Sequence, residues 1–454
     1  MKIITIIREF GSGEIQLSDH FTYKRLLQFT FPSMIMMVFT SLYSVVDGFF
    51  VSNFVGKTPF AAVNFIMPVL MILGSIGFMF GSGGSALVSK TMGEGDMDRA
   101  RRLFSLFVYS TVVCGVVISV ISFIFIRPLA ALMGAEGDML NNCVTYARIL
   151  LPSLPFFMLQ FEFQSFFITA EKPQLGLVVT VVCGLANMVL DALFMAVFSW
   201  GLVGAAAATA ISQMLGGAIP ILYFSKSSSG VLRLTKTGLD GKALIKACTN
   251  GSSELMSNIS MSIVSILYNF QLMKYAGENG IAAYGVLMYI NLFFLAIFIG
   301  YSTGVAPIVS YHYGAENHSE LKGLLKKSYM IIGVFAVAMF GLAELLAKPL
   351  AGIFVGYDKE LMEMTTRAFM IYSFSFLFSG IAIYGSSFFT ALNDGLTSAL
   401  ISFLRSLLFQ VAAVMILPMI FGIDGIWFSV VAAELVAAVM TVLFIAAKKG
   451  KYHY

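Results

Sequence analysis

The chain has 454 residues, of which 58% are hydrophobic and only 11% are charged. A soluble domain carries roughly 25% charged residues, so this composition excludes an ordinary water-soluble fold. The net charge of +4 is small, and no Lys/Arg tract is interleaved with aromatic residues, so we expect no nucleic-acid partner.

The N-terminal region does not have the pattern of a cleavable signal peptide. Residues 1–25 include Asp19, His20, Lys24 and Arg25, and no apolar run there ends in a small-residue cleavage site. The four cysteines contain no CxxC pair and the four histidines are scattered, so we expect neither disulfides nor a zinc site. No cofactor is expected.

Twelve apolar segments follow one another along the chain, each long enough to cross a bilayer, which takes roughly 20 helical residues. Six precede a polar stretch and six follow it. They cover residues 26–55, 59–89, 103–126, 139–170, 174–198, 202–225, 243–274, 280–311, 324–347, 360–391, 395–421 and 425–447. The sequence therefore predicts an all-α integral membrane protein with twelve transmembrane helices, in contact with the lipid bilayer.

Lysine and arginine are distributed unevenly between the two sides of the predicted membrane. With both termini placed inside, 20 of the 28 basic residues fall in cytoplasmic segments. Positive charge is retained on the cytoplasmic side of membrane proteins. This bias predicts a multi-pass protein of the cell's inner (plasma) membrane, with both termini in the cytoplasm.

The two halves of the chain repeat each other at a constant offset of 221 residues. Gly83, Val88, Ser89 and Gly93 fall on Gly304, Val309, Ser310 and Gly314, and Pro128, Leu129 and Ala130 fall on Pro349, Leu350 and Ala351. Each repeat holds six spans, so both halves enter the membrane in the same direction, with a substrate cavity expected between them. We predict two pseudo-symmetric six-helix lobes, 1–225 and 243–454, joined by a cytoplasmic linker at 226–242.

Ionisable side chains inside spans are costly and mark functional sites. Asp47 lies in the first span, one helical turn after Tyr43, and Asp191 lies in the fifth, one turn after Asn187. Thr209 belongs to a polar face of the sixth span. These five residues, all in the N-terminal half, are the candidate cation-coupling site.

The carboxylates of this candidate site do not recur in the second half. The 221-residue offset carries Asp47 to Tyr268 and Asp191 to Ala412. A symmetric fold with asymmetric charge indicates that one lobe carries an ion site. The plainer interpretations are that Asp47 is a helix-end residue facing headgroups, and that Asp191 belongs to a structural clamp between helices.

Further polar residues are candidates for a cavity or a substrate site. Glu162 lies in the middle of the fourth span, and Gln213 follows Thr209 by one turn on the sixth. Glu254 begins a polar stripe in the seventh span. The stripe continues through Asn258, Ser262, Ser265 and Asn269. It either lines a cavity or packs small residues against another helix.

Several motifs resemble those of the multidrug and toxic compound extrusion (MATE) family, in its MepA-like bacterial branch, over nearly the whole chain. They are Pro32 followed by VVDGFFVSNFVG, then GSGGSALVSKTMGEGD, NMVLD, GAAAATAISQ and APIVSYHYGAEN. The resemblance implies two six-helix lobes forming a V and cation-coupled export of amphipathic, often cationic, organic compounds.

The resemblance also implies roles for individual residues. The family's N-lobe cation site, a possible Na⁺ site, carries over to Asp47, Asn187, Asp191 and Thr209, with Tyr43 one turn before the first aspartate. A tyrosine of the family's fourth helix matches Tyr146. Some members carry an acid deep in the seventh span, whereas Glu254 lies near the start of that span in this chain.

We therefore expect a monomeric antiporter that exports organic cations in exchange for H⁺ or Na⁺, the coupling ion being left open. The alternative within the same superfamily is a flippase for lipid-linked oligosaccharides, whose phosphates would need basic residues in the cavity. Only Arg148, Arg367 and Arg405 lie in or near spans. No HExxH motif supports an intramembrane enzyme, and no repeated filter segment supports a channel.

Overall fold

The computed structural model describes residues 15–226 and 230–454, and every regular element in this part of the chain is a helix. The first six predicted spans correspond to seven α-helices, because the fourth span is divided. They are α2 (Tyr23–Phe54), α3 (Lys57–Gly93), α4 (Met97–Leu132), α5 (Gly137–Leu150) with α6 (Leu154–Thr169), α7 (Pro173–Asp191) and α8 (Gly201–Ser225).

The last six predicted spans also correspond to seven α-helices. They are α9 (Gly241–Gly314), α10 (His318–Val355), α11 (Lys359–Ser373) with α12 (Phe376–Ala391), α13 (Gly395–Phe403) with α14 (Phe409–Phe421), and α15 (Ile423–Tyr452). Ten helices in the described ranges are long and apolar enough to cross a membrane. The pair α11 and α12, bent by 51°, makes one further span.

Helix α9 contains two of the predicted spans. Its 74 residues would extend about 110 Å, whereas the hydrocarbon core of a bilayer is about 30 Å thick. Gly277 interrupts it with φ 61° and ψ −149°, a conformation open to glycine and strained for other residues. Counting its two halves separately brings the number of crossings to the predicted twelve.

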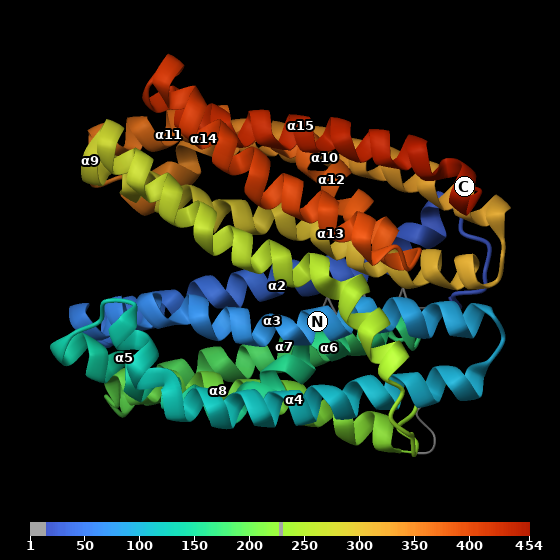
Figure 1. The fold of residues 1–454 in the computed structure, drawn as a ribbon. Coiled ribbons are helices and arrows are strands. Elements are labelled where there is room, and N and C mark those ends of the chain that lie inside the picture. The colour runs from blue at the N-terminus through green and yellow to red at the C-terminus, as the bar shows by residue number, and fades with distance from the viewer. Residues whose placement is uncertain (1–14, 227–229) are drawn as a thin grey trace.

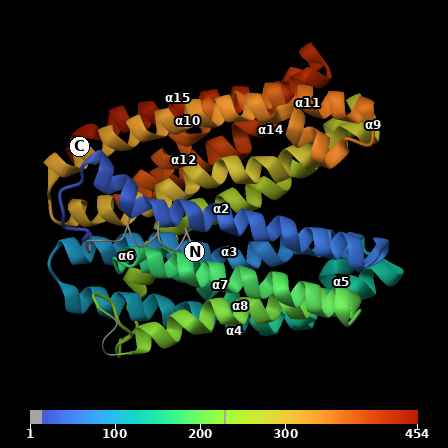
Figure 2. The same ribbon diagram turned by 180° about the vertical axis from the view of Figure 1, so that it is seen from behind.

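The helices form two bundles. Helices α2–α8, here called the N lobe, lie on one side, and α9–α15, the C lobe, lie on the other (Figure 1). The helix axes of the two lobes come together near the C-terminus and diverge toward α5 and α11, as the view from behind also shows (Figure 2). Aliphatic side chains on the outside of α4, such as Val113 and Ile124, are exposed, as expected for a surface in contact with lipid.

The lobes cross backbone to backbone at glycines that are related by the repeat. A β-carbon on Gly93 would lie 2.0 Å from the carbonyl oxygen of Tyr311, and one on Gly314 would lie 2.0 Å from that of Lys90. Tyr311 is itself the 221-residue counterpart of Lys90. The pseudo-twofold axis therefore passes between these two contacts, at what we call the closed end of the bundle.

The segment before α2, residues 15–22, lies across the closed end and contacts both lobes. The backbone N–H of Leu17 donates to Glu171 Oε1 of the N lobe at 2.7 Å. The N–H of Phe21 donates to Glu320 Oε1 of the C lobe at 3.0 Å, and Lys327 Nζ donates to the Phe21 carbonyl. Because Leu17 and Phe21 are also fully buried, this segment fastens the lobes together.

The last turns of α15 are anchored to the loop between α12 and α13. Tyr452 Oη donates to Asp394 Oδ2 at 2.8 Å, and Thr397 Oγ1 donates to the same oxygen at 2.8 Å. Lys448 Nζ lies 3.4 Å from it. Burial opposes ionisation of Asp394, but these hydrogen bonds and the nearby ammonium outweigh it and hold the pKa of Asp394 below its ordinary value.

Replacing Gly93 with alanine should destabilise the protein, because the added methyl group has no room against the Tyr311 carbonyl. Overpacking of this kind costs about 1–3 kcal/mol. Gly314→Ala should have the same effect through the related contact. The matched control is Gly333→Ala in α10, where a β-carbon meets nothing within 4 Å. Thermal unfolding in detergent should show both crossing variants melting below wild type and Gly333→Ala melting at or above it.

Asp394→Asn should lower stability at neutral pH by about 1–2 kcal/mol, because the amide keeps the hydrogen-bonding shape but not the charge. The pKa of Asp394 is lower in the folded than in the unfolded protein, so its contribution is complete above its unfolded pKa of about 3.9. The contribution is lost as pH falls further. The free energies of unfolding of wild type and Asp394→Asn, measured from pH 7 down to pH 3, should converge in acid. A difference between them that stays constant with pH would contradict this role.

Candidate functional site

The residues predicted to couple a cation come from three helices of the N lobe. Asp47 lies on α2, Asn187 and Asp191 lie one turn apart at the end of α7, and Thr209 lies on α8. Asn187 is 3% exposed and Asp191 is fully buried, whereas Asp47 and Thr209 are partly buried. The spacing of one helical turn directs both α7 side chains toward the inside of the lobe.

A glycine on α7 brings α2 close enough for this arrangement. A β-carbon on Gly184 would lie 2.6 Å from Cε1 of Phe39 and 2.9 Å from Cδ1 of Tyr43. Both aromatic rings therefore pack directly on the backbone of α7. This packing places Asp47, one turn beyond Tyr43, beside the last turn of α7.

The backbone changes its helical form at the site. A π-helical stretch, Ala192–Val197, begins immediately after Asp191. Single π-helical turns are rare, and many occur at functional sites because they redirect side chains that a regular helix would space evenly. The irregularity sets the end of α7, and with it the position of the Asp191 carboxylate.

The Asp47 and Asp191 carboxylates face each other at interaction range. Both oxygens of Asp191 and Oδ1 of Asp47 are buried and receive no hydrogen bond from the described residues. Two ionised carboxylates have no hydrogen to donate to each other, and at this range they repel. A proton shared between them, or a cation placed between them, would remove both problems.

Neutral polar groups surround the two carboxylates. Tyr146 is 1% exposed and interacts with Thr209 through its hydroxyl. Thr209 Oγ1 donates to the Ala205 carbonyl at 3.1 Å, so its oxygen can act only as a hydrogen-bond acceptor or a cation ligand toward the site. The Asn187 amide nitrogen has no partner among the described residues. This set of two carboxylates and neutral oxygens suits a proton or a monovalent cation.

The structure places the remaining candidates outside this group. Gln213 Oε1 accepts from Ser153 Oγ at 2.7 Å, toward the α5–α6 junction. Glu162 is fully buried on the opposite side of α6, beside Thr111 of α4. Asn258 Nδ2 donates to the carbonyl of Glu254 at 2.9 Å, so these two residues of α9 are linked along their own helix.

Two polar neighbours of the site were missed in the sequence. Gln160, 7% exposed on α6, interacts with the Tyr43 hydroxyl, and Gln164 one turn later has a buried amide nitrogen without a partner in the described ranges. Both are amides in an otherwise apolar span, FFMLQFEFQSFF. That contrast could have identified them, but the acid between them, Glu162, faces the other way.

The equivalent region of the C lobe has its polar groups paired. Tyr268, the counterpart of Asp47, donates through its hydroxyl to Gln410 Oε1 at 3.0 Å. Arg405 Nε lies 2.9 Å from Glu434 Oε2, a buried ion pair. Unpaired buried carboxylate oxygens at this level therefore belong to the N lobe. Twelve crossings in two related lobes, with a carboxylate pair inside one of them, define a membrane transporter.

The MatE family model matches residues 32–193 and again residues 255–416. This chain therefore belongs to the MatE family, whose members are transporters and not enzymes. The two matched ranges begin at residues 32 and 255, close to the 221-residue offset of the internal repeat, so the family unit is a half-transporter that occurs twice in the chain.

Known proteins resemble the chain over almost its whole length. "Multidrug export protein MepA" from Staphylococcus aureus is 25% identical over 424 residues, 93% of each chain. A solved structure described as MATE in complex with MaL6 superimposes with a TM-score of 0.91 at 22% identity, covering 95% of this chain and 97% of that one. An outward-facing multidrug resistance MATE transporter of the MOP superfamily gives a TM-score of 0.90 at 22% identity, covering 95% and 96%.

Proposed function

We propose that this protein is a secondary antiporter that exports cationic amphipathic compounds in exchange for H⁺ or Na⁺. The observation that carries the proposal is the Asp47–Asp191 pair, buried in one lobe with oxygens that no described residue satisfies. A transporter needs one site whose occupancy changes the relative stability of two conformations. A ligand shifts such an equilibrium only by its difference in affinity for the two states.

Ion binding at this pair would act directly on α2. With the pair empty, the two carboxylates repel each other across the α2–α7 contact made at Gly184. A proton or Na⁺ between them replaces repulsion by attraction and draws α2 toward α7. Because α2 also packs on α9 of the C lobe, through Ser41 Oγ and the Leu292 carbonyl at 3.3 Å, this movement would reach the lobe interface.

A cationic substrate fits the charges of the chain. Four acids within spans, Asp47, Glu162, Asp191 and Glu254, have no basic partner among the described residues, whereas Glu434 is paired with Arg405. The name of the MepA relatives, multidrug export protein, agrees with varied organic substrates. We propose that the protein acts in the plasma membrane as a monomer, with the termini, the closed end and residues 226–242 in the cytoplasm.

The flippase alternative is less favoured because its required arginines are occupied. Arg367 pairs with Asp424 at 2.5 Å, and Arg405 pairs with Glu434. The guanidinium of Arg148 lies 5.3 Å from the centre of the Phe123 ring. A lipid-linked phosphate would have to displace these partners.

Asp47→Asn should abolish coupling without preventing folding, because asparagine keeps the shape of the side chain but cannot titrate or pair charge with a cation. The assay is ethidium transport into inverted vesicles, with a pH gradient or a Na⁺ gradient imposed separately. The transport rate should fall about tenfold or more, which is the factor that a typical coupling energy produces. Asp191→Asn should fall similarly. The gradient that drives wild type identifies the ion.

Glu254→Gln is the matched control, because it removes an acid within a span that lies outside the carboxylate pair. It should retain most of the transport rate, and dye binding to Asp47→Asn in detergent should persist. Wild-type transport by Asp47→Asn together with an inactive Glu254→Gln would place the ion site in the C lobe and overturn the assignment. Protection of cells against anionic compounds alone would favour the flippase.

The proposed topology is tested at Lys236, an exposed residue of the segment between α8 and α9. A cysteine placed there should be unreactive toward a membrane-impermeant maleimide on intact cells and should react after the membrane is opened. Leu132→Cys, 86% exposed at the opposite end of α4, is the control and should react on intact cells. The reverse pattern would invert the topology.

A further inference from the structure

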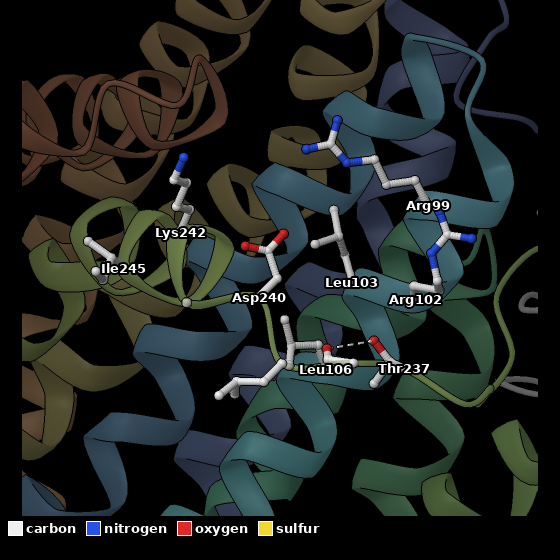
Figure 3. Close-up of a pocket in the computed structure, with 11 residues that line it drawn as sticks. Arg99, Arg102, Leu103, Leu106, Thr237, Asp240, Lys242 and Ile245 are labelled. Atoms are coloured by element: carbon white, nitrogen blue, oxygen red, sulfur yellow. Dashed lines mark hydrogen bonds between the residues drawn. The ribbon is translucent and has the colours of Figure 1, made fainter.

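A cavity of about 740 Å³ opens at the closed end, on the outer side of the N lobe. It lies between the first turns of α4, the segment that precedes α9, and the first turn of α9 itself. The transport site inside the N lobe does not include any of its lining residues. Figure 3 shows basic side chains from two helices around it, Arg99 and Arg102 from α4 and Lys242 from α9.

These three cations have no ion-pair partner among the described residues, whereas the neighbouring Arg101 is engaged. Arg101 contacts Asp98 at 3.7 Å and donates to the Val231 carbonyl at 3.0 Å. One carboxylate, that of Asp240, does lie among the cations (Figure 3). Its Oδ1 accepts from the backbone N–H of Ala243 and caps α9. Three cations outnumber this one carboxylate, so the cavity has an excess of positive charge.

The rest of the lining is apolar. Leu103 and Leu106 form a buried floor, and Ile245 is 68% exposed at the rim. Leu239 is 86% exposed in the segment that precedes α9. Exposed leucine and isoleucine next to free cations would be unfavourable in water, but they suit the boundary between headgroups and acyl chains.

The apolar surface continues from the cavity along one face of α4. Leu106 is followed at helical spacing by Tyr109, Val113 and Val120, all three exposed. Tyr109 donates through its hydroxyl to the Thr235 carbonyl at 3.4 Å, which holds its ring beside the segment that lines the cavity. Tyrosine at this position, between cations and aliphatic residues, is typical of a membrane interface.

We propose that this cavity binds the headgroup of an anionic phospholipid from the leaflet at the closed end. The phosphate would lie among Arg99, Arg102 and Lys242, and an acyl chain would follow Tyr109 and Val113 along α4. A bound lipid would join the start of α9, the first helix of the C lobe, to α4 of the N lobe.

The repeat supplies an internal comparison. The 221-residue offset carries Arg99 to Glu320 and Arg102 to Gly323, so the corresponding turn of α10 lacks both arginines. Glu320 is occupied there by the segment before α2. The proposed lipid site therefore has no counterpart at the start of α10. That helix provides exposed lysines, Lys322 and Lys326, for a control with the same change of charge.

The experiment measures lipid binding to the purified, delipidated full chain by native mass spectrometry. Wild type, Arg99→Gln/Arg102→Gln and Lys322→Gln/Lys326→Gln are each titrated with phosphatidylglycerol and with phosphatidylcholine. Each basic residue near a membrane surface changes anionic-lipid affinity about fivefold, so the arginine pair should weaken phosphatidylglycerol binding about 30-fold. The lysine pair should change it less than about twofold, and phosphatidylcholine should bind weakly to all three.

Inorganic phosphate, added as a competitor, distinguishes a lipid from a soluble anion. It should fail to displace phosphatidylglycerol, because it lacks the acyl chain that contacts α4. Displacement by phosphate would assign the cavity to a soluble anion and overturn the proposal. Equal losses of binding in the two double variants would indicate diffuse electrostatic attraction to the closed end and would overturn the proposal. Unchanged phosphatidylglycerol binding in both variants, or equally tight binding of phosphatidylcholine, would overturn it as well.

Discussion

The structure depends on one packing constraint, the backbone contact between α3 and α9 at Gly93 and Gly314. Lipid is as apolar as the helices, so no hydrophobic force drives two lobes together in a membrane, and close packing of small residues must do so instead. Each glycine lies against the carbonyl of the other's preceding turn, and Gly83 lies in the same way against the Ala247 carbonyl. Because the two main contacts are related by the repeat, the lobes meet symmetrically at this end, where the segment before α2 also holds them.

The symmetric frame carries an asymmetric distribution of charge. In the C lobe, Tyr268 and Gln410 satisfy each other, and Arg405 neutralises Glu434. In the N lobe, Asp47 and Asp191 face each other without a donor or a countercharge from the described residues. A buried polar group that is left unpaired is costly in a low-dielectric interior. Among the described residues, the N lobe therefore holds buried carboxylate oxygens without partners, whereas the polar groups at the same level of the C lobe are paired.

The closed end combines this lobe contact with two different surfaces. Its inner face is occupied by residues of the chain itself, since Glu320 and Lys327 hold the segment before α2. Its outer face on the N lobe presents Arg99 and Arg102, which have no ion-pair partner among the described residues, beside exposed apolar residues. The equivalent positions of α10 carry Glu320 and Gly323 instead of the two arginines, although the two helices begin at related residues.

The amino-acid sequence by itself determined the class of fold, the twelve crossings and the repeat, because long apolar segments, charge bias and a constant offset are linear properties of a chain. It also singled out Asp47 and Asp191, since acids are rare in spans, together with Asn187 one turn before Asp191 and Thr209 on a polar face of the sixth span. Only the tertiary structure decided which of the polar residues meet. Glu162 and Gln160 are two positions apart in one span, yet they face opposite sides of α6. The rotation of each helix against its neighbours decides whether a side chain points to a carboxylate or away from it. That rotation is set by contacts between residues far apart in the sequence, such as Gly184 against Tyr43.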